Sequence, residues 1–334
     1  MTTIPGKQQV QEPEGSVIGW LLDSDPSIRW QVMRDLTDTP DEEVAAERAK
    51  VATEGRGASI LAAQGEDGIW GDDRRFPEWP TFRTLLLLQD MGVDPASEQA
   101  KMAVSRVRDN VSWLMGIAEE ELPKDEDISW FHKPLFEGEV EPCINGRVVA
   151  VGAYFGEEMG PLVERLLGEQ MADGGWNCEQ ENGSTRGSFN TTICVLEGLL
   201  EYERAAGSSP AVSAARQRGE EYLLERRLLR RLSTGEVIEH DRKEGIHFTD
   251  FPYPAGWRYN VLRALDYLRA AGVQPDERMQ EAIDVIVSQR DASGRWPLGR
   301  VYPEEVVGEP GVAEGQPSRW NTLRALRVLD WYAA

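Results

Sequence analysis

The segment from His240 to Tyr253 carries the side chains best suited to acid–base chemistry. It contains His247, Asp250 and Tyr253, and it is the longest stretch in the second half of the chain without helical periodicity. Long loops in compact domains are often functional. If this loop covers a cavity, burial raises the pKa of Asp250 and lets its carboxyl act as a general acid. We therefore predict catalytic roles for His247, Asp250 and Tyr253.

Thiol and imidazole groups in the chain could hold a metal ion. Cys143 and Cys178 lie beside a predicted helix start and a predicted turn, and His132 lies upstream of both. Thiolate and imidazole ligands suit Zn²⁺. No C-x-x-C or H-x-x-x-H spacing is present to fix the geometry. Cys143, Cys178 and His132 are thus candidate zinc ligands, and the alternative is that both cysteines are simply packed or exposed.

The helices and turns that must position these groups belong to a motif that occurs three times in the sequence. A glutamine, a glycine and a tryptophan follow an apolar run of helical spacing in each copy. The glycine comes after acidic or small polar residues and is expected to adopt a positive φ that ends the helix. The tryptophan is predicted to plug the space between packed helices. The copies are Gln64–Gly68–Trp70, Gln170–Gly174–Trp176 and Gln289–Gly294–Trp296.

A second apolar helix is expected after each copy, at residues 81–91, 190–202 and 321–332. Two more helices are predicted at 259–268 and from near Asn145. Paired helices that recur along the chain, with hardly any strand signal, predict an all-α fold.

The glutamine–glycine–tryptophan turns resemble the repeat of squalene and oxidosqualene cyclases. The segment 169–199 is similar to the prenyltransferase and squalene-oxidase repeat proteins, and the resemblance runs from about Ile18 to the C-terminus. It implies an α/α toroid, in which an inner ring of helices surrounds a central cavity and an outer ring wraps it. It also implies an isoprenoid or similar hydrophobic ligand, a prenyl diphosphate among the candidates, with cyclase or transferase chemistry.

The chain departs from this superfamily at the residues that carry its chemistry. It lacks the D-x-D-D motif whose aspartate protonates an alkene in class II cyclases. The aspartate, cysteine and histidine that bind zinc in protein prenyltransferases cannot be matched residue by residue. Two alternatives therefore stay open: a non-catalytic binding or scaffold protein on the same fold, and a carbohydrate-active α/α-toroid enzyme.

Arginines occur near the starts of several predicted inner helices. If these helices are parallel, as the resemblance implies, the arginines gather at one mouth of the toroid. Helix N-termini and guanidinium groups both favour oxyanions. We predict that Arg147, Arg258 and Arg319 bind a diphosphate or carboxylate there, whereas the alternative pairs each arginine with one of the 58 acidic side chains. The set also includes Arg83 and Arg186.

Aromatic residues in loops and at helix starts are expected to face the cavity. An aromatic lining suits a hydrophobic ligand and can stabilise a carbocation. Trp130, Trp257 and Trp320 are the candidates for substrate binding.

Composition limits the remaining possibilities. The 334 residues are expected to form one toroid domain, 16–334, after a disordered arm at 1–15. A net charge of −22 disfavours nucleic acid and anionic membrane surfaces. No transmembrane segment or export signal is recognisable, and three cysteines form no disulfide framework, so a cytoplasmic location is expected.

Overall fold

The computed structural model describes residues 16–71, 76–114, 132–239 and 245–334. Helices dominate this part of the chain, so the all-α class predicted from the sequence is confirmed. The predicted arm at 1–15 and Trp130 lie outside the described residues. The helices are α1 (Val17–Leu22), α2 (Pro26–Leu36), α3 (Asp41–Ala49), α4 (Gly55–Ala62), α5 (Glu78–Met91), α6 (Glu98–Asn110), α7 (Pro142–Phe155), α8 (Gly160–Gly168), α9 (Phe189–Ala206), α10 (Pro210–Glu225), α11 (Val261–Ala270), α12 (Gln280–Ser288) and α13 (Arg319–Ala333).

Short strands and 3-10 turns connect some of these helices. Two antiparallel ladders are formed, one pairing β1 with β2 and the other pairing β3 with β4. The strands are β1 (Ser112–Leu114), β2 (His132–Pro134), β3 (Trp296–Pro297) and β4 (Pro317–Ser318). The 3-10 turns are η1 (Lys50–Ala52), η4 (Leu135–Glu137), η5 (Cys178–Gln180) and η6 (Glu277–Met279).

Short polar side chains fix the starts of three long helices. Ser188 caps α9, Asn260 caps α11 and Ser318 caps α13, each accepting a hydrogen bond from a backbone N–H in the first turn. These helices, together with α5 and α7, are the five expected from the apolar pattern. None of the helices in the described ranges is both long and apolar enough to cross a bilayer.

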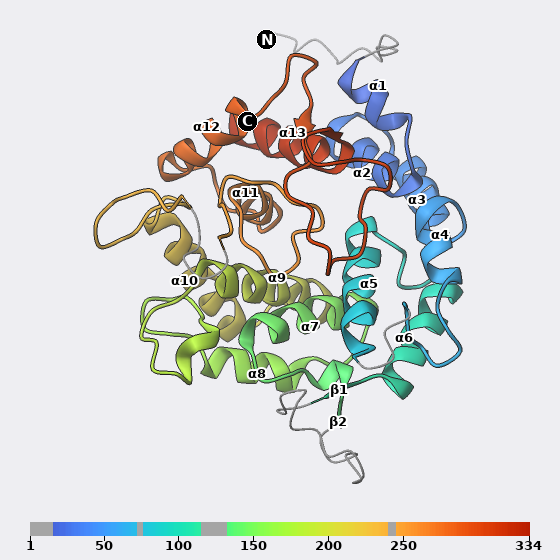
Figure 1. Cartoon of the computed structure of the whole chain (residues 1–334), viewed down its shortest axis with the longest axis horizontal. Helices are drawn as coiled ribbons and strands as arrows, with labels where there is room; N and C mark the ends of the chain where they lie inside the picture. Colours follow the sequence, from blue (N-terminus) through green and yellow to red (C-terminus); the bar gives the residue numbers. More distant parts are fainter. Residues whose placement is uncertain (1–15, 72–75, 115–131, 240–244) are drawn as a thin grey trace, which may run out of the picture.

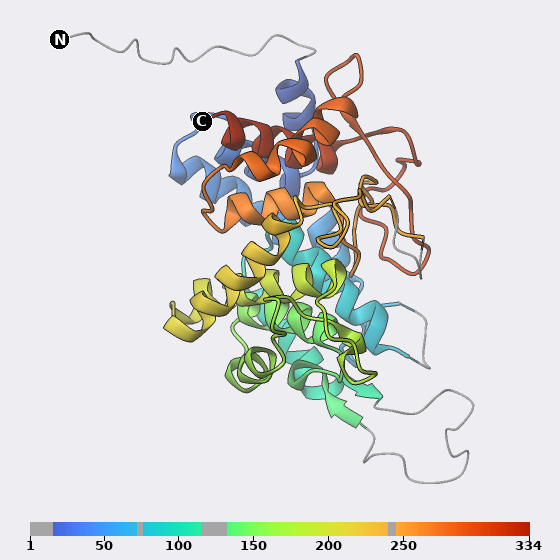
Figure 2. The ribbon, with the colours of Figure 1, turned by 90° about the vertical axis from the view of Figure 1, so that its left-hand side faces the viewer.

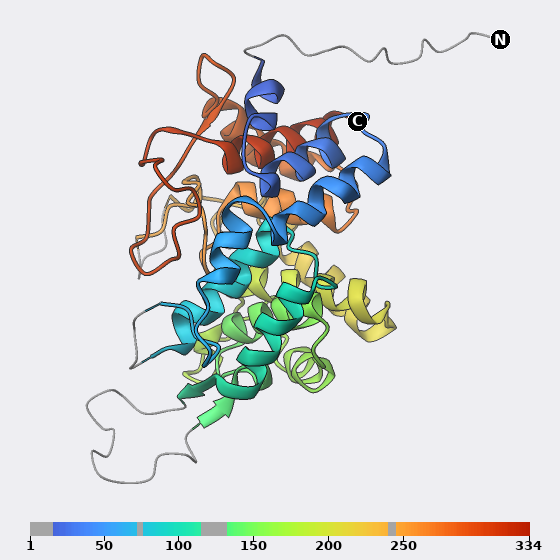
Figure 3. The same cartoon turned by 90° about the vertical axis from the view of Figure 1, so that its right-hand side faces the viewer.

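The chain follows a circuit, because its last helix returns to one of its first. Figure 1 shows the helices arranged round the molecule in sequence order, with α13 beside α2. Arg327 of α13 donates to Gln31 of α2 at 3.1 Å, and one connected hydrophobic core extends from Leu21 to Val328. Figure 2 and Figure 3 show segments 245–260 and 298–316 gathered on one side. The closed ring of an α/α toroid stays a prediction.

The repeated tryptophans act as plugs, as their sequence context predicts. Trp70, Trp176 and Trp296 are 4%, 0% and 0% exposed. Each indole N–H donates at 2.7 Å to the carbonyl ten residues earlier, at the end of the preceding helix. The backbone N–H of each tryptophan also donates to a threonine hydroxyl of the following long helix. The repeat is therefore a structural clamp between consecutive helices.

The turns themselves need glycine for two reasons. Gly174 has a φ of +86°, and a Cβ placed there would lie 2.5 Å from the carbonyl oxygen of Arg218. The amide of Gln170 then binds the carbonyls of Gly174 and Ala215, at 2.7 and 2.8 Å. Gln64 repeats this pattern with the first turn and α6.

Helices α7 and α9 touch backbone to backbone. A Cβ at Gly198 of α9 would lie 2.1 Å from the carbonyl oxygen of Gly146, and a Cβ at Gly146 would lie 2.6 Å from the carbonyl oxygen of Cys194. This contact brings the neighbouring residues Arg147 and Glu197 into an ion pair at 3.3 Å.

Replacing Gly198 with alanine is expected to lower the free energy of unfolding by about 1–3 kcal/mol, because the added methyl must push two helix backbones apart. The matched control is Gly168→Ala in α8, where a Cβ would meet nothing within 4 Å. That change should be neutral or stabilise by up to about 1 kcal/mol. Urea denaturation of both variants measures the difference, and equal stabilities would contradict the backbone contact.

Candidate functional site

A central cavity of about 620 Å³ lies among helices from all parts of the chain. Residues of α2, α3, α5, α7, α9, α11 and α13 line it. Many belong to the later turns of these helices, such as Asp90 in α5, Tyr154 in α7 and Arg204 in α9. Trp320 and the segment 254–256, next to the beginnings of α13 and α11, also contribute. The cavity thus unites residues that are distant in sequence.

The lining of this cavity is rich in arginine, although the whole chain carries a net charge of −22. Eight arginines face five carboxylates among the described lining residues. A concave site with an excess of one charge attracts counter-ions of the opposite sign. The arginines are Arg34, Arg48, Arg147, Arg204, Arg263, Arg269, Arg324 and Arg327, and the acids are Asp35, Asp90, Glu197, Glu201 and Asp266.

Glu197 is neutralised within the wall. Arg263 binds it through two nitrogens, at 2.7 and 2.6 Å, and Arg147 approaches at 3.3 Å. Burial alone would raise the pKa of Glu197, but the guanidinium groups of Arg263 and Arg147 outweigh it and lower the pKa. Arg263 also donates to the carbonyls of Gly256 and Arg258, so it is fully engaged in structure.

Asp266 forms a second neutralised group. Arg327 binds it through two nitrogens, and Arg269 approaches at 3.2 Å. Burial would raise the pKa of Asp266, but these two arginines lower it well below its ordinary value. Arg327 also reaches Asp35 at 3.4 Å. Arg263 and Arg327 therefore hold the helices together.

Three of the lining arginines have donors that no described carboxylate uses. Within the described residues Arg48 makes no ion pair; it donates to the Gly92 carbonyl and to Tyr154, both at 3.0 Å. The Nε atoms of Arg147 and Arg324 are buried and have no hydrogen-bond partner in the described part. Arg324 approaches Asp90 at 3.1 Å, but the Asp90 side chain is 38% exposed. These guanidinium groups could bind an oxyanion.

Glu201 is the cavity carboxyl best suited to hold a proton. Burial raises its pKa, although Arg204 at 3.2 Å and Arg48 oppose the shift. A raised pKa lets a carboxyl donate a proton nearer neutral pH. No motif in the sequence marks this residue.

The predicted acid–base residues do not line the central cavity in the described structure. His247 is exposed, and Asp250 accepts a hydrogen bond from the backbone N–H of Arg300 at 3.0 Å. Tyr253 is buried, which raises its pKa well above the ordinary value, and its hydroxyl has no partner in the described part. Its ring stacks on that of Trp320, which lines the cavity, with the ring centres 4.7 Å apart.

The predicted arginines are not gathered at one mouth. Arg147 lines the central cavity. Arg258 is buried between Glu304 and Glu305 with its guanidinium 3.5 Å from the Tyr302 ring centre. Arg319 donates to backbone carbonyls of residues 20 and 23 and lines a second cavity, also about 620 Å³, beside α2 and α4. The alternative reading, in which arginines pair with acids, describes Arg258 and also Arg83, 3.9 Å from Glu305.

The predicted aromatic residues do not all line the central cavity. Trp320 is buried and lines both cavities. Trp257 is partly buried and packs under the guanidinium of Arg258, 5.0 Å from it. Trp30 and Leu86, which the sequence did not single out, supply apolar surface to the central cavity.

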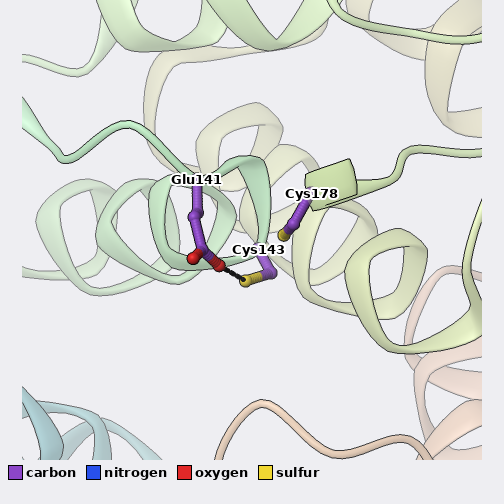
Figure 4. A group of neighbouring side chains, drawn as sticks. All are labelled: Glu141, Cys143 and Cys178. Atoms are coloured by element: carbon purple, nitrogen blue, oxygen red, sulfur yellow. Dashed lines mark hydrogen bonds between the residues drawn. The ribbon is translucent and has the colours of Figure 1, made fainter. Parts of the chain in front are cut away.

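The two predicted cysteine ligands come together at the start of α7. Figure 4 shows Cys143 and Cys178 side by side, with Glu141 completing the group. Their ligand atoms all lie within 4.8 Å of one another, and Cys143 Sγ lies 3.4 Å from a Glu141 carboxylate oxygen. His132 is exposed in β2 and is not part of this group. The hydrogen bond between the thiols raises the pKa of Cys143 and lowers that of Cys178.

A sequence signal could have pointed to part of the central cavity. The helix start Asn-x-Leu-Arg-Ala-Leu occurs twice and places Arg263 and Arg324 at equivalent positions. Both arginines interrupt otherwise apolar helical faces, which is uncommon unless the charge is paired or functional. Arg48 and Glu201 have no such signal.

No model of a known protein family matches the sequence, and no curated protein matches it. Solved structures show a limited similarity in shape. A protein from Actinoplanes is 15% identical, with 93% of this chain and 91% of that chain covered and a TM-score of 0.45. The type II terpene cyclase MstE from Scytonema is 18% identical, with 91% and 86% covered and a TM-score of 0.45. A variant of that cyclase in complex with its substrate, geranylgeranyl dihydroxybenzoate, is 18% identical, with 92% and 86% covered and a TM-score of 0.44. Similarities of this size assign neither a family nor an activity to this chain.

Proposed function

We propose that this protein binds a small anionic molecule in its central cavity. The observation that carries the proposal is the excess of guanidinium groups over carboxylates in the described lining. Arg48, Arg147 and Arg324 are the contacts, because Arg48 pairs with no acid of the described residues and Arg147 and Arg324 each keep an Nε donor without a partner there. Charge-assisted hydrogen bonds from arginine are strong and suit phosphate and carboxylate oxygens.

The finer part of the proposal follows the sequence resemblance. In it, residues 16–334 form one α/α toroid, and the ligand is an isoprenoid with a charged head, such as a prenyl diphosphate. Trp30, Leu86 and Trp320 offer apolar contacts beside the arginines. If the ligand is transformed by cyclase or transferase chemistry, Glu201 is the proton donor or acceptor best placed by its raised pKa.

The non-catalytic binding protein is the second candidate, and one observation favours it. Each of the five cavity carboxylates has an arginine partner within 4.0 Å. Such pairing stabilises the ionised carboxylate, which is a weaker acid catalyst than a neutral carboxyl. Product analysis after incubation with a prenyl diphosphate separates binding from turnover.

Titration with three related ligands tests the charge proposal. Farnesyl diphosphate and inorganic diphosphate should both bind, while farnesol should bind at least about tenfold more weakly than farnesyl diphosphate, because each lost charge-assisted hydrogen bond costs about 1.5–3 kcal/mol. Quenching of the cavity residues Trp30 and Trp320 offers a fluorescence readout, with calorimetry as a check. Equal affinity for farnesol and its diphosphate would overturn the anion site.

A further inference from the structure

Glu141, Cys143 and Cys178 form a group that is not part of the lining of the central cavity. Each side chain offers one atom that can bind a metal ion. Two sulfurs and one carboxylate oxygen converge within 4.8 Å. Figure 4 shows that the three side chains point toward one another from two different segments. Neither cysteine is in a disulfide. Packing alone does not require two thiols and an acid to meet.

The separations fit a tetrahedral metal ion. With Zn–S bonds of about 2.3 Å, two sulfurs on one tetrahedral zinc lie about 3.8 Å apart. The ligand atoms of the group already lie within 4.8 Å of one another, so a shift of about 1 Å or less brings the two sulfurs to this spacing. Rotation of the exposed Glu141 side chain adjusts the position of the carboxylate oxygen without moving the backbone.

The supporting elements hold both cysteines in place. Cys143 lies in the first turn of α7, which Glu141 precedes as the N-cap residue. Cys178 opens η5 directly after the clamped tryptophan turn, and its thiol lies 3.4 Å from the hydroxyl of Thr191 in α9. Because α7 and α9 pack backbone to backbone, the two thiols belong to one rigid unit. A preformed site costs little to organise on binding.

The negative charge of the group also favours a bound cation. In the described part of the chain Glu141 makes no ion pair, whereas the buried acids Glu47 and Glu220 do. A second acid, Glu139, lies beside it and accepts the backbone N–H of Glu141 at 2.7 Å. No arginine or lysine of the described residues neutralises Glu141 or the thiols within 4.0 Å. A divalent ion would do so.

We propose that Glu141, Cys143 and Cys178 bind one soft divalent metal ion, with Zn²⁺ as the expected ion. Two thiolates and a carboxylate are ligands that zinc accepts, and three protein ligands leave one coordination position open. The donor set differs from the aspartate, cysteine and histidine implied by the resemblance to prenyltransferases, because a second thiol replaces the imidazole. Cys143 lies one helical turn before Arg147, so the metal would lie near the wall of the central cavity.

Metal binding to the full-length protein tests this inference. The protein is purified under reducing conditions, stripped with a chelator, and titrated with Zn²⁺ against a competing indicator; Co²⁺ loading gives a sulfur-to-metal charge-transfer band. One equivalent of Zn²⁺ is expected. Loss of a hydrogen-bond partner of a ligand already costs about 10–100-fold in metal affinity, so Cys143→Ser and Cys178→Ser should each cost about 100-fold or more. Glu141→Gln, which keeps an oxygen, should cost about tenfold.

The matched control is Cys194→Ser, which changes a buried thiol outside the group. Its Zn²⁺ affinity and Co²⁺ spectrum should equal those of the unchanged protein, and far-ultraviolet circular dichroism checks the fold of every variant. Absence of stoichiometric Zn²⁺ binding, or a Zn²⁺ affinity of the Cys143→Ser or Cys178→Ser variant equal to that of the unchanged protein, would overturn the site. The diphosphate titration is run on stripped protein, so the two proposals fail independently.

Discussion

Replacing Trp176 with alanine is expected to lower the free energy of unfolding by about 3–5 kcal/mol, the cost of removing a fully buried large aromatic side chain. Trp176 is 0% exposed, and its indole N–H donates at 2.7 Å to the Leu166 carbonyl at the end of α8. Truncation opens a cavity and leaves that carbonyl without its partner. Urea denaturation, followed by circular dichroism, measures the loss.

Trp176→Phe is the matched control for this experiment. Phenylalanine keeps most of the apolar volume but cannot donate, so it should cost less than alanine, about 1–3 kcal/mol for the unsatisfied carbonyl. Trp296→Ala should behave like Trp176→Ala, because its indole makes the equivalent 2.7 Å bond to Ile286. If alanine at either position cost less than about 1 kcal/mol, the clamp would not hold the helix pairs together.

The clamp could be predicted from sequence because its determinants are local. Gln170, Gly174 and Trp176 lie within seven residues, and the positive φ of Gly174 is a property that few other residues supply. The caps of α11 and α13, Asn260 and Ser318, are local in the same way, since a cap acts on its own first turn, and the apolar pattern predicted these two helices at 259–268 and 321–332, within two residues of where each begins. Interactions between residues close in sequence were therefore enough to predict the helices and their turns.

The candidate site could be predicted only in part, because its partners come from distant segments. Arg258 was expected to bind a ligand, yet Glu304 and Glu305, more than 45 residues away, occupy its guanidinium. The path of that acidic segment depends on how β3 and β4 pair, which no local pattern specifies. Cys143 and Cys178 lie together, but His132 of β2 is not in their group, whereas Glu141, two residues before Cys143, is.

The arginines of the central cavity could not be predicted as a site, because they too come from distant segments. Arg48, from α3, meets Tyr154 of α7 across 106 residues, and Arg324 of α13 meets Asp90 of α5 across 234. Each residue taken alone reads as an ordinary partner for one of the many acids. They form a candidate site only because the fold brings them together. That arrangement follows from the circuit that returns α13 to α2.

Changing both Arg147 and Arg324 to glutamine is expected to weaken diphosphate binding by about 100-fold or more. Each removes a guanidinium that faces the central cavity, and a hydrogen bond to a charged group is worth about 1.5–3 kcal/mol, or about tenfold or more in affinity. The fold should survive, because Arg263 still holds Glu197 through two nitrogens and Asp90 is 38% exposed. Calorimetric titration of the single and double variants at low and high salt measures the loss and its electrostatic origin.

Arg319→Gln is the decisive comparison for this prediction, because it removes the same charge from the same helix as Arg324→Gln. Arg319 donates to two backbone carbonyls and faces the second cavity, so its loss should change diphosphate affinity by less than about threefold. The reverse result, with Arg319→Gln abolishing binding and the Arg147 and Arg324 variants retaining it, would move the anion site to the helix starts that the sequence pattern favours. Loss of binding in all three variants with unchanged circular dichroism would contradict a site confined to the central cavity, since only two of these arginines line it.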